Sequence, residues 1–523
     1  MSKQIAGSKT LIKSISWIFA IILCVLASIF VGVELMGSKT AAEDRVLRVA
    51  FQGTWKTPLN PPSQHMMIED AILANEFESL LCRGENGLVL PLAAKFFAVN
   101  EDFTVYDFKI DERRKFSDGS PLTAQDFKSS WEQGLRLRKN SANRNAEDVL
   151  QPLIGFEAFD ESGKISGIEV VDTHTLRLHY KQPFRMALMH LTGARFAAFK
   201  QTDTGMIGTG RFAMQEVSND RVTMLPNKYH PDGPGHFSRI EILGLSDPYK
   251  AIESGQVDLV AYSSRRFAET PEVGSTAGVE DTAGWMHLNS LNGRFFADMR
   301  LRQAFQFLVF EVLKEHKADV ENLPTQFTLD HQTFLPLQAG RIPDEEAEAI
   351  IRQGGKFVEL LVSESKKRPI KTSIYGAYSF ILEGLRSKGL IIENKVFDTV
   401  PDLMNDFYLG HTQDVLLCGA SVHVSDPDGM YHLLGKSGAI TSPMIHTPRV
   451  VSQFETGRYL VDQGEIPKFY ENVTRTILEE VPSVHIGFIA HGYLYRKDRL
   501  KPDRTLLERH FDQILHIFHP ADL

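Results

Sequence analysis

The side chains that most often carry chemistry are numerous in this chain, but their spacing matches no reaction that we recognise. Among 523 residues there are 18 histidines, 66 acidic residues and three cysteines. The sequence contains no Gly-x-Ser-x-Gly elbow, no Walker phosphate loop, no His-Glu-x-x-His and no Cys-x-x-Cys pair. These patterns position a nucleophile, a phosphate or a metal ion. We therefore expect no catalytic residue, no metal site and no cofactor.

Individual candidates within this set have ordinary structural interpretations. Segment 205–210 contains three glycines but does not match the dinucleotide-binding fingerprint. Any two carboxylates can meet in a cleft, so an exported hydrolase stays open as a minor alternative. Five histidines lack the i, i+4 spacing that puts two metal ligands on one helical face: His174, His179, His190, His230 and His236.

The composition is that of a large folded protein with a mildly acidic surface. Hydrophobic residues make up 43% and charged residues 24%, which excludes a largely disordered chain and a multi-span membrane protein. The net charge is −9, and no run of five basic residues occurs. Nucleic acid is therefore not an expected partner, because binding it requires a clustered basic face. The length favours two or three domains, and three cysteines cannot build a disulfide framework.

The N-terminus predicts export. Residues 14–33 carry no charge, and a helix of about 20 residues spans the hydrocarbon core of a bilayer. Three lysines precede this run, so the positive-inside rule keeps that end cytoplasmic and exports the remainder. We expect residues 1–42 to be a signal peptide or membrane anchor of a periplasmic protein. Either residues 14–33 tether it to the inner membrane, or cleavage near the small residues 40–42 leaves it soluble.

Beyond residue 43 the hydrophobic pattern is that of a mixed α/β protein without sequence repeats. Residues 115–119 form a predicted turn before a helix that starts near Thr123, with Asp126 favoured in its first turn. Strands are predicted at 45–51, 104–110, 165–171, 175–180, 221–225, 239–245, 356–362 and 414–417. Helices are predicted at 69–81, 299–314, 344–353, 375–388 and 468–480. This succession suits lobes that each consist of a sheet covered by helices.

Segments along almost the whole exported chain resemble the family 5 extracellular solute-binding proteins, which are the periplasmic receptors of oligopeptide, dipeptide and nickel ATP-driven importers. The most recognisable block is YDFKI at 106–110 followed by KFSDGSPLTAQDF at 115–127. One match precedes this block, LAAK at 92–95. The others follow it in the order of the family: SGIEVVD at 166–172, TLRL at 175–178, GTG at 208–210, AIESGQVD at 251–258, DMRLRQA at 298–304 and LEEVP at 478–482.

The resemblance implies the large two-lobed periplasmic-binding-protein fold. By analogy, residues 43–265 and 482–523 would form lobe one, with an additional subdomain at 61–164. Residues 266–481 would form lobe two. Such receptors close over a ligand by a hinge motion, and the ligand lies in the cleft between the lobes.

The resemblance also implies a ligand site. In the peptide binders of the family the segment that matches 419–428 lines the cleft, with Trp at the position of Ala420 and Asp at that of His423. That Asp receives the α-ammonium of the peptide. We therefore expect either ligands whose amine is blocked or absent, or a different acid that replaces this Asp, with the ligand bound chiefly through backbone groups. Alternatively, His423 is a loop residue without a ligand role. The implied ligand-binding residues are Gly419, Ala420, Ser421 and His423. We expect residues 426–428 to start a helix rather than bind metal.

Together these features predict a receptor rather than an enzyme. The expected function is that of the solute-binding component of an ABC importer for a peptide or peptide-like ligand. Its expected partners are that ligand, the permease subunits of the transporter and, through the N-terminal segment, the membrane; the receptor itself is expected to be a monomer. The alternative is a membrane-tethered, receptor-like protein that serves sensing or assembly instead of uptake.

Overall fold

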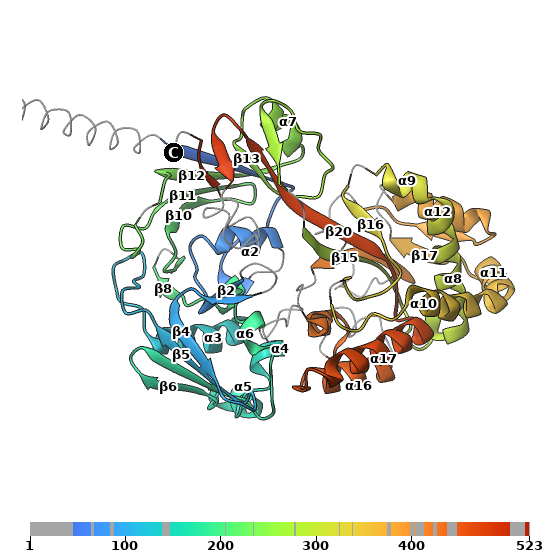
Figure 1. Ribbon diagram of the computed structural model, residues 1–523, viewed down its shortest axis with the longest axis horizontal. Coiled ribbons are helices and arrows are strands. Elements are labelled where there is room, and N and C mark those ends of the chain that lie inside the picture. The colour runs from blue at the N-terminus through green and yellow to red at the C-terminus, as the bar shows by residue number, and fades with distance from the viewer. Residues whose placement is uncertain are drawn as a thin grey trace, which may run out of the picture.

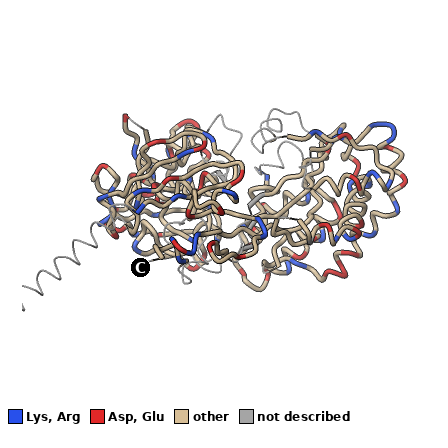
Figure 2. The backbone as a smooth tube through the Cα atoms, turned by 90° about the horizontal axis from the view of Figure 1, so that it is seen from above, with Lys and Arg blue, Asp and Glu red and all other residues tan. Residues whose placement is uncertain are grey.

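The protein consists of two bodies that lie side by side, as both views of the chain show (Figures 1 and 2). The computed structural model describes residues 45–521 except 64–66, 84–87, 139–146, 204, 234, 277–278, 324, 337, 374–377, 398–402, 404–412, 422–425, 437–446 and 503–517. Basic and acidic residues are interspersed over both bodies (Figure 2).

One twelve-stranded sheet passes through both bodies, in the order β10-β11-β12-β1-β13-β20-β15-β19-β17-β18, with β14 and β16 paired to β20 beside this path. Its strands are β1 Val46–Gln52, β10 Phe212–Val217, β11 Arg221–Pro226, β12 Arg239–Leu245, β13 Leu259–Ser263, β14 Val273–Ser275, β15 Val279–Leu288, β16 Phe327–Leu329, β17 Ile370–Ser373, β18 Ile392–Asn394, β19 Val415–Ser421 and β20 Ser483–Arg496. Strand β1 is parallel to β12 and β13, and β20 is antiparallel to β13 and β15.

Strand β20 belongs to the sheets of both bodies. From Ser483 to His491 it pairs with β15, and its central residues also pair with β16. From Gly492 onward it pairs with β13 and β14 of the first body. In Figure 1 it runs diagonally from one body into the other, so this strand connects the two cores directly.

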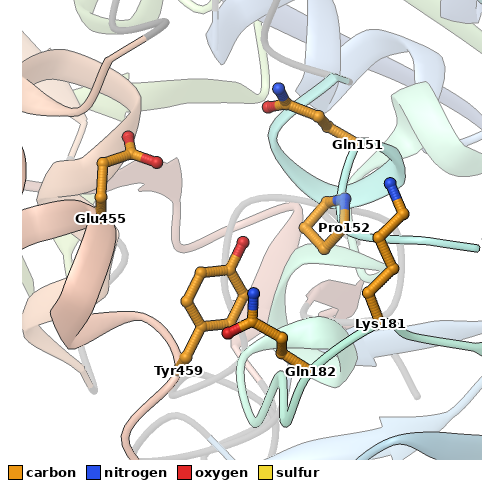
Figure 3. Close-up of a pocket in the computed structure, with 6 residues that line it drawn as sticks. All are labelled: Gln151, Pro152, Lys181, Gln182, Glu455 and Tyr459. Atoms are coloured by element: carbon orange, nitrogen blue, oxygen red, sulfur yellow. The ribbon is translucent and has the colours of Figure 1, made fainter. Parts of the chain in front are cut away.

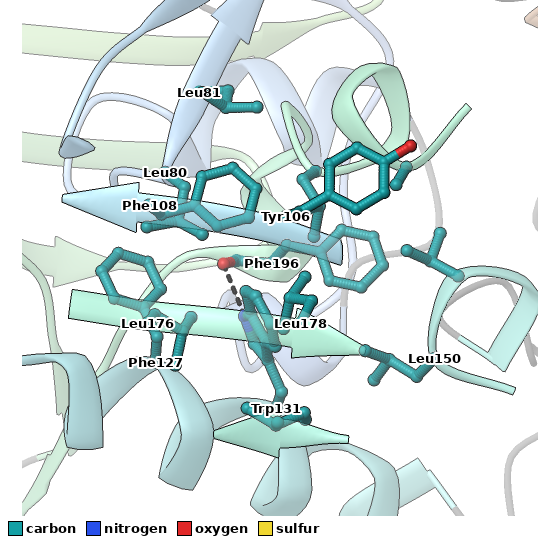
Figure 4. Close-up of a cluster of buried hydrophobic side chains, with 14 of the residues drawn as sticks. Leu80, Leu81, Tyr106, Phe108, Phe127, Trp131, Leu150, Leu176, Leu178 and Phe196 are labelled. Atoms are coloured by element: carbon teal, nitrogen blue, oxygen red, sulfur yellow. Dashed lines mark hydrogen bonds between the residues drawn. The ribbon is translucent and has the colours of Figure 1, made fainter. Parts of the chain in front are cut away.

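The first body has a second, four-stranded antiparallel sheet in the order β4-β5-β7-β6. Helix α3 packs against it, and the aromatic rings of Tyr106, Phe108, Phe127 and Trp131 lie buried between them (Figure 4). The indole Nε1 of Trp131 donates a hydrogen bond to the carbonyl oxygen of Phe196 at 2.8 Å, which satisfies the polar atom of that buried ring. The four strands are β4 Ala94–Val99, β5 Val105–Ile110, β6 Ile168–Asp172 and β7 Thr175–His179.

Short elements complete the first body. Its helices are α2 Met67–Leu73, α3 Ala124–Arg138, α4 Glu147–Leu150, α5 Phe159–Ser162, α6 Ala187–His190 and α7 Pro248–Glu253. Its two-stranded pairs are β2 Leu81–Arg83 with β3 Val89–Pro91, β8 Lys200–Thr202 with β9 Gly205–Ile207, and β21 Leu500–Pro502 with β22 Phe518–Pro520.

Helices cover the strands of the second body. Helix α8 buries Phe305, Val309 and Val312 in a core shared with Met286 of β15 and Leu361 of α11. The helices are α8 Met299–Glu315, α9 Lys317–Glu321, α10 Asp344–Arg352, α11 Val358–Lys367, α12 Ser379–Ser387, α14 Tyr431–Leu434, α16 Pro448–Gly457 and α17 Glu465–Glu480. The mixed α/β class predicted from the sequence is confirmed.

The turn and helix predicted around residues 115–127 are present. Gly119 has a φ of 89°, which the turn requires and glycine adopts readily. The backbone N–H and the hydroxyl of Thr123 donate to the carboxylate of Asp126 at 2.7 and 2.6 Å. These bonds form just before α3 begins and fix its first turn.

Two of the sequence-based elements are wrong. The helix predicted at 69–81 ends at Leu73, because the side-chain amide of Asn75 donates to the carbonyls of Ala71 and Ile72 and so ends the helix. The strand predicted at 356–362 is helical, in a 3₁₀ turn followed by α11. A short apolar run does not distinguish a strand from a helix, and in this segment packing against α8 favours the helix.

No helix within the described ranges is both long and apolar enough to cross a membrane. The apolar segment 14–33 lies outside the described residues.

Candidate functional site

Three of the four predicted ligand-binding residues lie at the end of one strand. Gly419, Ala420 and Ser421 end β19, where they pair with Gly284, Ala283 and Thr282 of β15. The strand is longer than the segment 414–417 predicted from the sequence. His423 lies outside the described residues, and the ligand contacts of all four remain a prediction.

Glycines line up across the sheet at this point. Gly284 pairs with Gly419 on one side and with Gly487 of β20 on the other. Gly487 has a φ of 150°, and a Cβ atom there would lie 2.2 Å from the carbonyl oxygen of Thr328, so only glycine fits. Gly419 is exposed, which leaves the backbone of β19 accessible. Glycine within a strand often marks a close approach of a ligand or another backbone.

A small polar and aromatic cluster lies beside this strand end, at the point where β20 passes between the bodies. The ring of Tyr262 on β13 stacks on that of His491, with centroids 4.0 Å apart and planes 6° apart. The hydroxyl of Thr282 lies 3.4 Å from His491 Nδ1 and 3.3 Å from the Tyr262 hydroxyl. Tyr262 adopts a φ of 57°, unusual for an aromatic residue. Because Thr282 pairs with Ser421, this cluster lies directly beside the candidate strand end.

Charged side chains meet across the boundary between the bodies. We refer to Arg185, His190, Asp426, Asp428 and Arg458 as the interbody cluster. Arg185 Nη2 lies 2.7 Å from Asp426 Oδ1, and His190 Nε2 lies 3.6 Å from Asp428 Oδ2. The guanidinium of Arg458 lies 3.6 Å from the ring centroid of Tyr431 and 4.8 Å from that of Phe184. The pairs therefore join elements of the first body to elements of the second.

Burial determines the charge state of this cluster. Burial together with the charges of Arg458 and Arg195 lowers the pKa of His190, so this ring is neutral at pH 7. Burial raises the pKa of Asp428, but the Arg458 guanidinium and the His190 contact outweigh it and leave the pKa below its ordinary value. Burial raises the pKa of Asp426, and Arg185 opposes this rise.

A polar cavity of about 190 Å³ also spans the two bodies. As Figure 3 shows, Glu455 and Tyr459 come from the second body and face residues of the first body. The first-body residues that line it are Gln151, Pro152, Lys181 and Gln182. Glu455 accepts a hydrogen bond from the hydroxyl of Tyr431 at 2.7 Å, and the ring of Tyr431 contacts Arg458 of the interbody cluster. The amide, ammonium and carboxylate groups of this lining can donate and accept hydrogen bonds to a polar solute.

Metal-ligating and nucleophilic side chains are the groups from which a reaction centre is most often built. No three His, Cys, Asp or Glu side chains among them are placed to hold a metal ion. Burial raises the pKa of Cys418 on β19 to about 12, so this thiol is not a nucleophile at neutral pH.

The helix start predicted from the sequence at residues 426–428 is present: Asp426 caps a 3₁₀ turn that leads into α14. The sequence did not predict the ion-pair partner of Asp426, because Arg185 lies 241 residues away along the chain.

Comparison with known proteins confirms the resemblance found in the sequence. Residues 87–309 match the family described as bacterial extracellular solute-binding proteins, family 5 Middle. The periplasmic murein peptide-binding protein MppA of Escherichia coli (strain K12) is 27% identical over 33% of this chain and 35% of its own length. The dipeptide-binding protein DppE of Bacillus subtilis (strain 168) is 24% identical over 52% of this chain and 53% of its own. The matched stretches thus span about a third to a half of these relatives.

Solved structures extend the similarity of fold to nearly the whole chain. The Escherichia coli murein tripeptide binding protein MppA superposes with a TM-score of 0.76 at 17% identity, covering 91% of this chain and 99% of the other. Haemophilus influenzae OppA in complex with RPPGFSPFR gives 0.76 at 16% identity over the same shares. The protein therefore has the two-lobed fold of periplasmic binding proteins.

Proposed function

We propose that this chain, whose residues 87–309 match the family 5 solute-binding proteins, is the extracytoplasmic receptor of an ABC importer and binds a peptide or peptide-like solute. The family match carries the proposal. The polar cavity between the bodies supports it, because solute receptors bind where two lobes meet.

In this proposal the two bodies act as the lobes. Residues 43–265 and 482–523, with the subdomain 61–164, are assigned to lobe one, and residues 266–481 to lobe two. Strand β20 pairs with strands of both bodies, which suits a connection that bends while each core stays packed. Closure about such a connection is a hinge motion.

A bound solute should raise the melting temperature of the full chain. A ligand that binds only the folded state stabilises it by about 2.7 kcal/mol at a hundredfold excess over Kd. Differential scanning calorimetry against panels of peptides, N-acylated peptides and other small polar solutes tests this. Absence of any shift across all panels would count against the receptor function.

We assign the receptor to the periplasm as a monomer that delivers its ligand to the permease subunits, with residues 14–33 as an uncleaved tether. The assignment rests on the uncharged run behind three lysines. The native protein should then fractionate with inner membranes and keep its encoded N-terminus. Mass spectrometry of the N-terminal peptide decides: a start near Glu43 would exclude the tether and leave export intact.

The end of β19 is proposed as the ligand contact, through Gly419, Ala420, Ser421 and His423. Its support is the exposed backbone at Gly419. A receptor without the amine-binding carboxylate of its relatives should prefer blocked amines, because an ammonium that loses its water without a partner is costly.

Changing His423 to Asp should therefore raise the affinity for a free-amine peptide by about tenfold or more, the usual value of a hydrogen bond to a charged group. Calorimetric titration with trialanine and N-acetyl-trialanine measures this in wild type and His423→Asp. His174→Asp, in the turn between β6 and β7, adds the same charge elsewhere and serves as the matched control. Equal affinities of wild type and His423→Asp for trialanine would remove His423 from the site.

A further inference from the structure

We propose that the interbody cluster is a closure lock, which holds the two bodies together through the charges of the protein itself and without a bound solute. The ligand-free receptor is then mostly closed, and solute enters when the lock opens. This inference goes beyond the proposed function, since it concerns the resting conformation and does not depend on which solute is bound.

The first half of the lock is the pair between Arg185 and Asp426. Their side chains are 6% and 19% exposed, and the charged atoms are 2.7 Å apart. Water screens such a pair much less than a surface ion pair. Arg185 Nη1 also lies within 3.5 Å of the carbonyl oxygen of Gly457 at the end of α16. One guanidinium of the first body therefore contacts two separate elements of the second.

Asp426 is held in position for this pair by a contact within its own body. Its Oδ1 atom accepts a hydrogen bond from the backbone N–H of Asp428 at 2.9 Å, as the N-cap of a helical turn. Fixing the carboxylate in advance reduces the entropy lost when the pair forms. Buried ion pairs often fail to stabilise because their geometry is poor, whereas the charged atoms of this pair are 2.7 Å apart; the Nε atom of Arg185 is buried without a hydrogen-bond partner and opposes part of this stabilisation.

The second half of the lock surrounds Arg458. Its side chain is 1% exposed, and its guanidinium lies 3.6 Å from the ring centroid of Tyr431, in its own body, and 4.8 Å from that of Phe184, in the other. Contact with two aromatic rings stabilises a desolvated guanidinium. Asp428, with no exposed surface, balances its charge, and His190 of the first body lies against that carboxylate. Separating the bodies would remove Phe184 and His190 from these charges.

The lock acts next to the proposed ligand contact. Strand β19 ends at Ser421, and Asp426 caps the next described element. Pairing of Asp426 with Arg185 therefore fixes the chain just beyond the candidate strand end against the first body. Arg185 is thus a positioning residue of the closed state.

The test measures the distance between the bodies in the full chain without added solute. Spin labels on the exposed residues Lys164 and Gln463, in a chain whose three native cysteines are changed to alanine, report that distance by double electron–electron resonance. The sample is unfolded in guanidinium, dialysed and refolded, and native mass spectrometry verifies that no small molecule remains bound. With Arg185 and Asp426 unchanged, most molecules should show the short distance between the two labels that corresponds to the closed state.

Two variants break the lock without disturbing the local fold. Asp426→Asn removes the charge and keeps an N-cap residue of equal quality, and Arg185→Met removes the guanidinium but keeps an unbranched side chain. In each, the ratio of closed to open protein should fall by a factor of about 30 or more, as for truncation of one partner of a buried ion pair. The matched control is Asp247→Asn, since Asp247 also caps a helix, accepting from Lys250 N at 3.2 Å, and lies outside the cluster.

Three results would overturn the proposal: a wild-type chain that is mainly open, variants with the wild-type distance distribution, or equal opening in Asp247→Asn. If the proposed receptor function is wrong, no solute should raise the melting temperature, while the distances between the spin labels should still be those expected for the lock. The two failures are therefore distinguishable.

Discussion

Replacing Glu78 by Gln should lower the free energy of unfolding by about 3–5 kcal/mol, the usual consequence of removing one partner from a buried ion pair. The Glu78 carboxylate is buried and accepts hydrogen bonds from the Arg114 guanidinium and, at 3.0 Å, from the Thr209 hydroxyl. His230 Nε2 lies 3.2 Å from the same carboxylate. The amide would leave the buried guanidinium of Arg114 without its direct ion-pair partner.

Urea denaturation of the full chain, followed by circular dichroism, measures this loss. The double variant Glu78→Leu, Arg114→Met removes both charges and should recover most of the stability, because two apolar groups replace a pair that was costly to desolvate. Glu157→Gln is the matched control: it breaks an ion pair with Lys181 on the surface and should shift the midpoint far less. A wild-type midpoint for Glu78→Gln would mean that this network does not stabilise the fold.

The contribution of one buried acid, Glu76, to the stability of the protein should fall as the pH rises from about 4.5 to 8. Burial raises the pKa of Glu76 to about 8, although the backbone N–H of Met214 donates to its carboxylate at 3.0 Å and opposes the rise. In this pH range the folded protein keeps a proton that the unfolded chain has released. The contribution is therefore fully present below pH 4.5 and is lost as the pH passes 8.

At 1.36 kcal/mol for each pH unit between 4.5 and about 8, the loss is of the order of 5 kcal/mol. Glu76→Gln has no proton to release, so its stability should lack this part of the pH dependence and should exceed that of wild type at pH 9. Denaturation midpoints of both proteins between pH 4 and 9 test this. Below pH 4.5 the difference between them should be constant, which is an internal control; parallel curves across the whole range would contradict the assignment.

Local sequence patterns predicted the structure correctly where residues close together in the chain determine it. The bonds between Thr123 and Asp126 join residues three apart, so the start of α3 was readable from the sequence. The glycines of segment 205–210 were correctly separated from a phosphate loop. Gly208 and Gly210 instead lie against the backbone of residues 75–76, where added Cβ atoms would come within 2.1 and 2.4 Å of carbonyl oxygens.

Features that depend on distant residues were not readable in the same way. The helical state of residues 358–367 depends on contact with α8. The end of α2 was missed although its cause is local, a side-chain amide of Asn75 that turns back on the helix. Arg185 has no local feature that marks it as the partner of Asp426, because the contact exists only once the bodies are assembled. The family resemblance indicated the segment 419–428 but not the charges that meet it.

The position of β20 in the chain sets the order in which the molecule can be completed. During synthesis, β13 at residues 259–263 emerges long before its partner at 483–496. At 5–20 residues per second the delay is roughly 10–50 s. Throughout that interval the sheet of the first body has an unpaired edge at β13, which neighbouring chains can bind. The first body is thus translated early but can complete its sheet only when residues 483–496 are available, close to the end of translation.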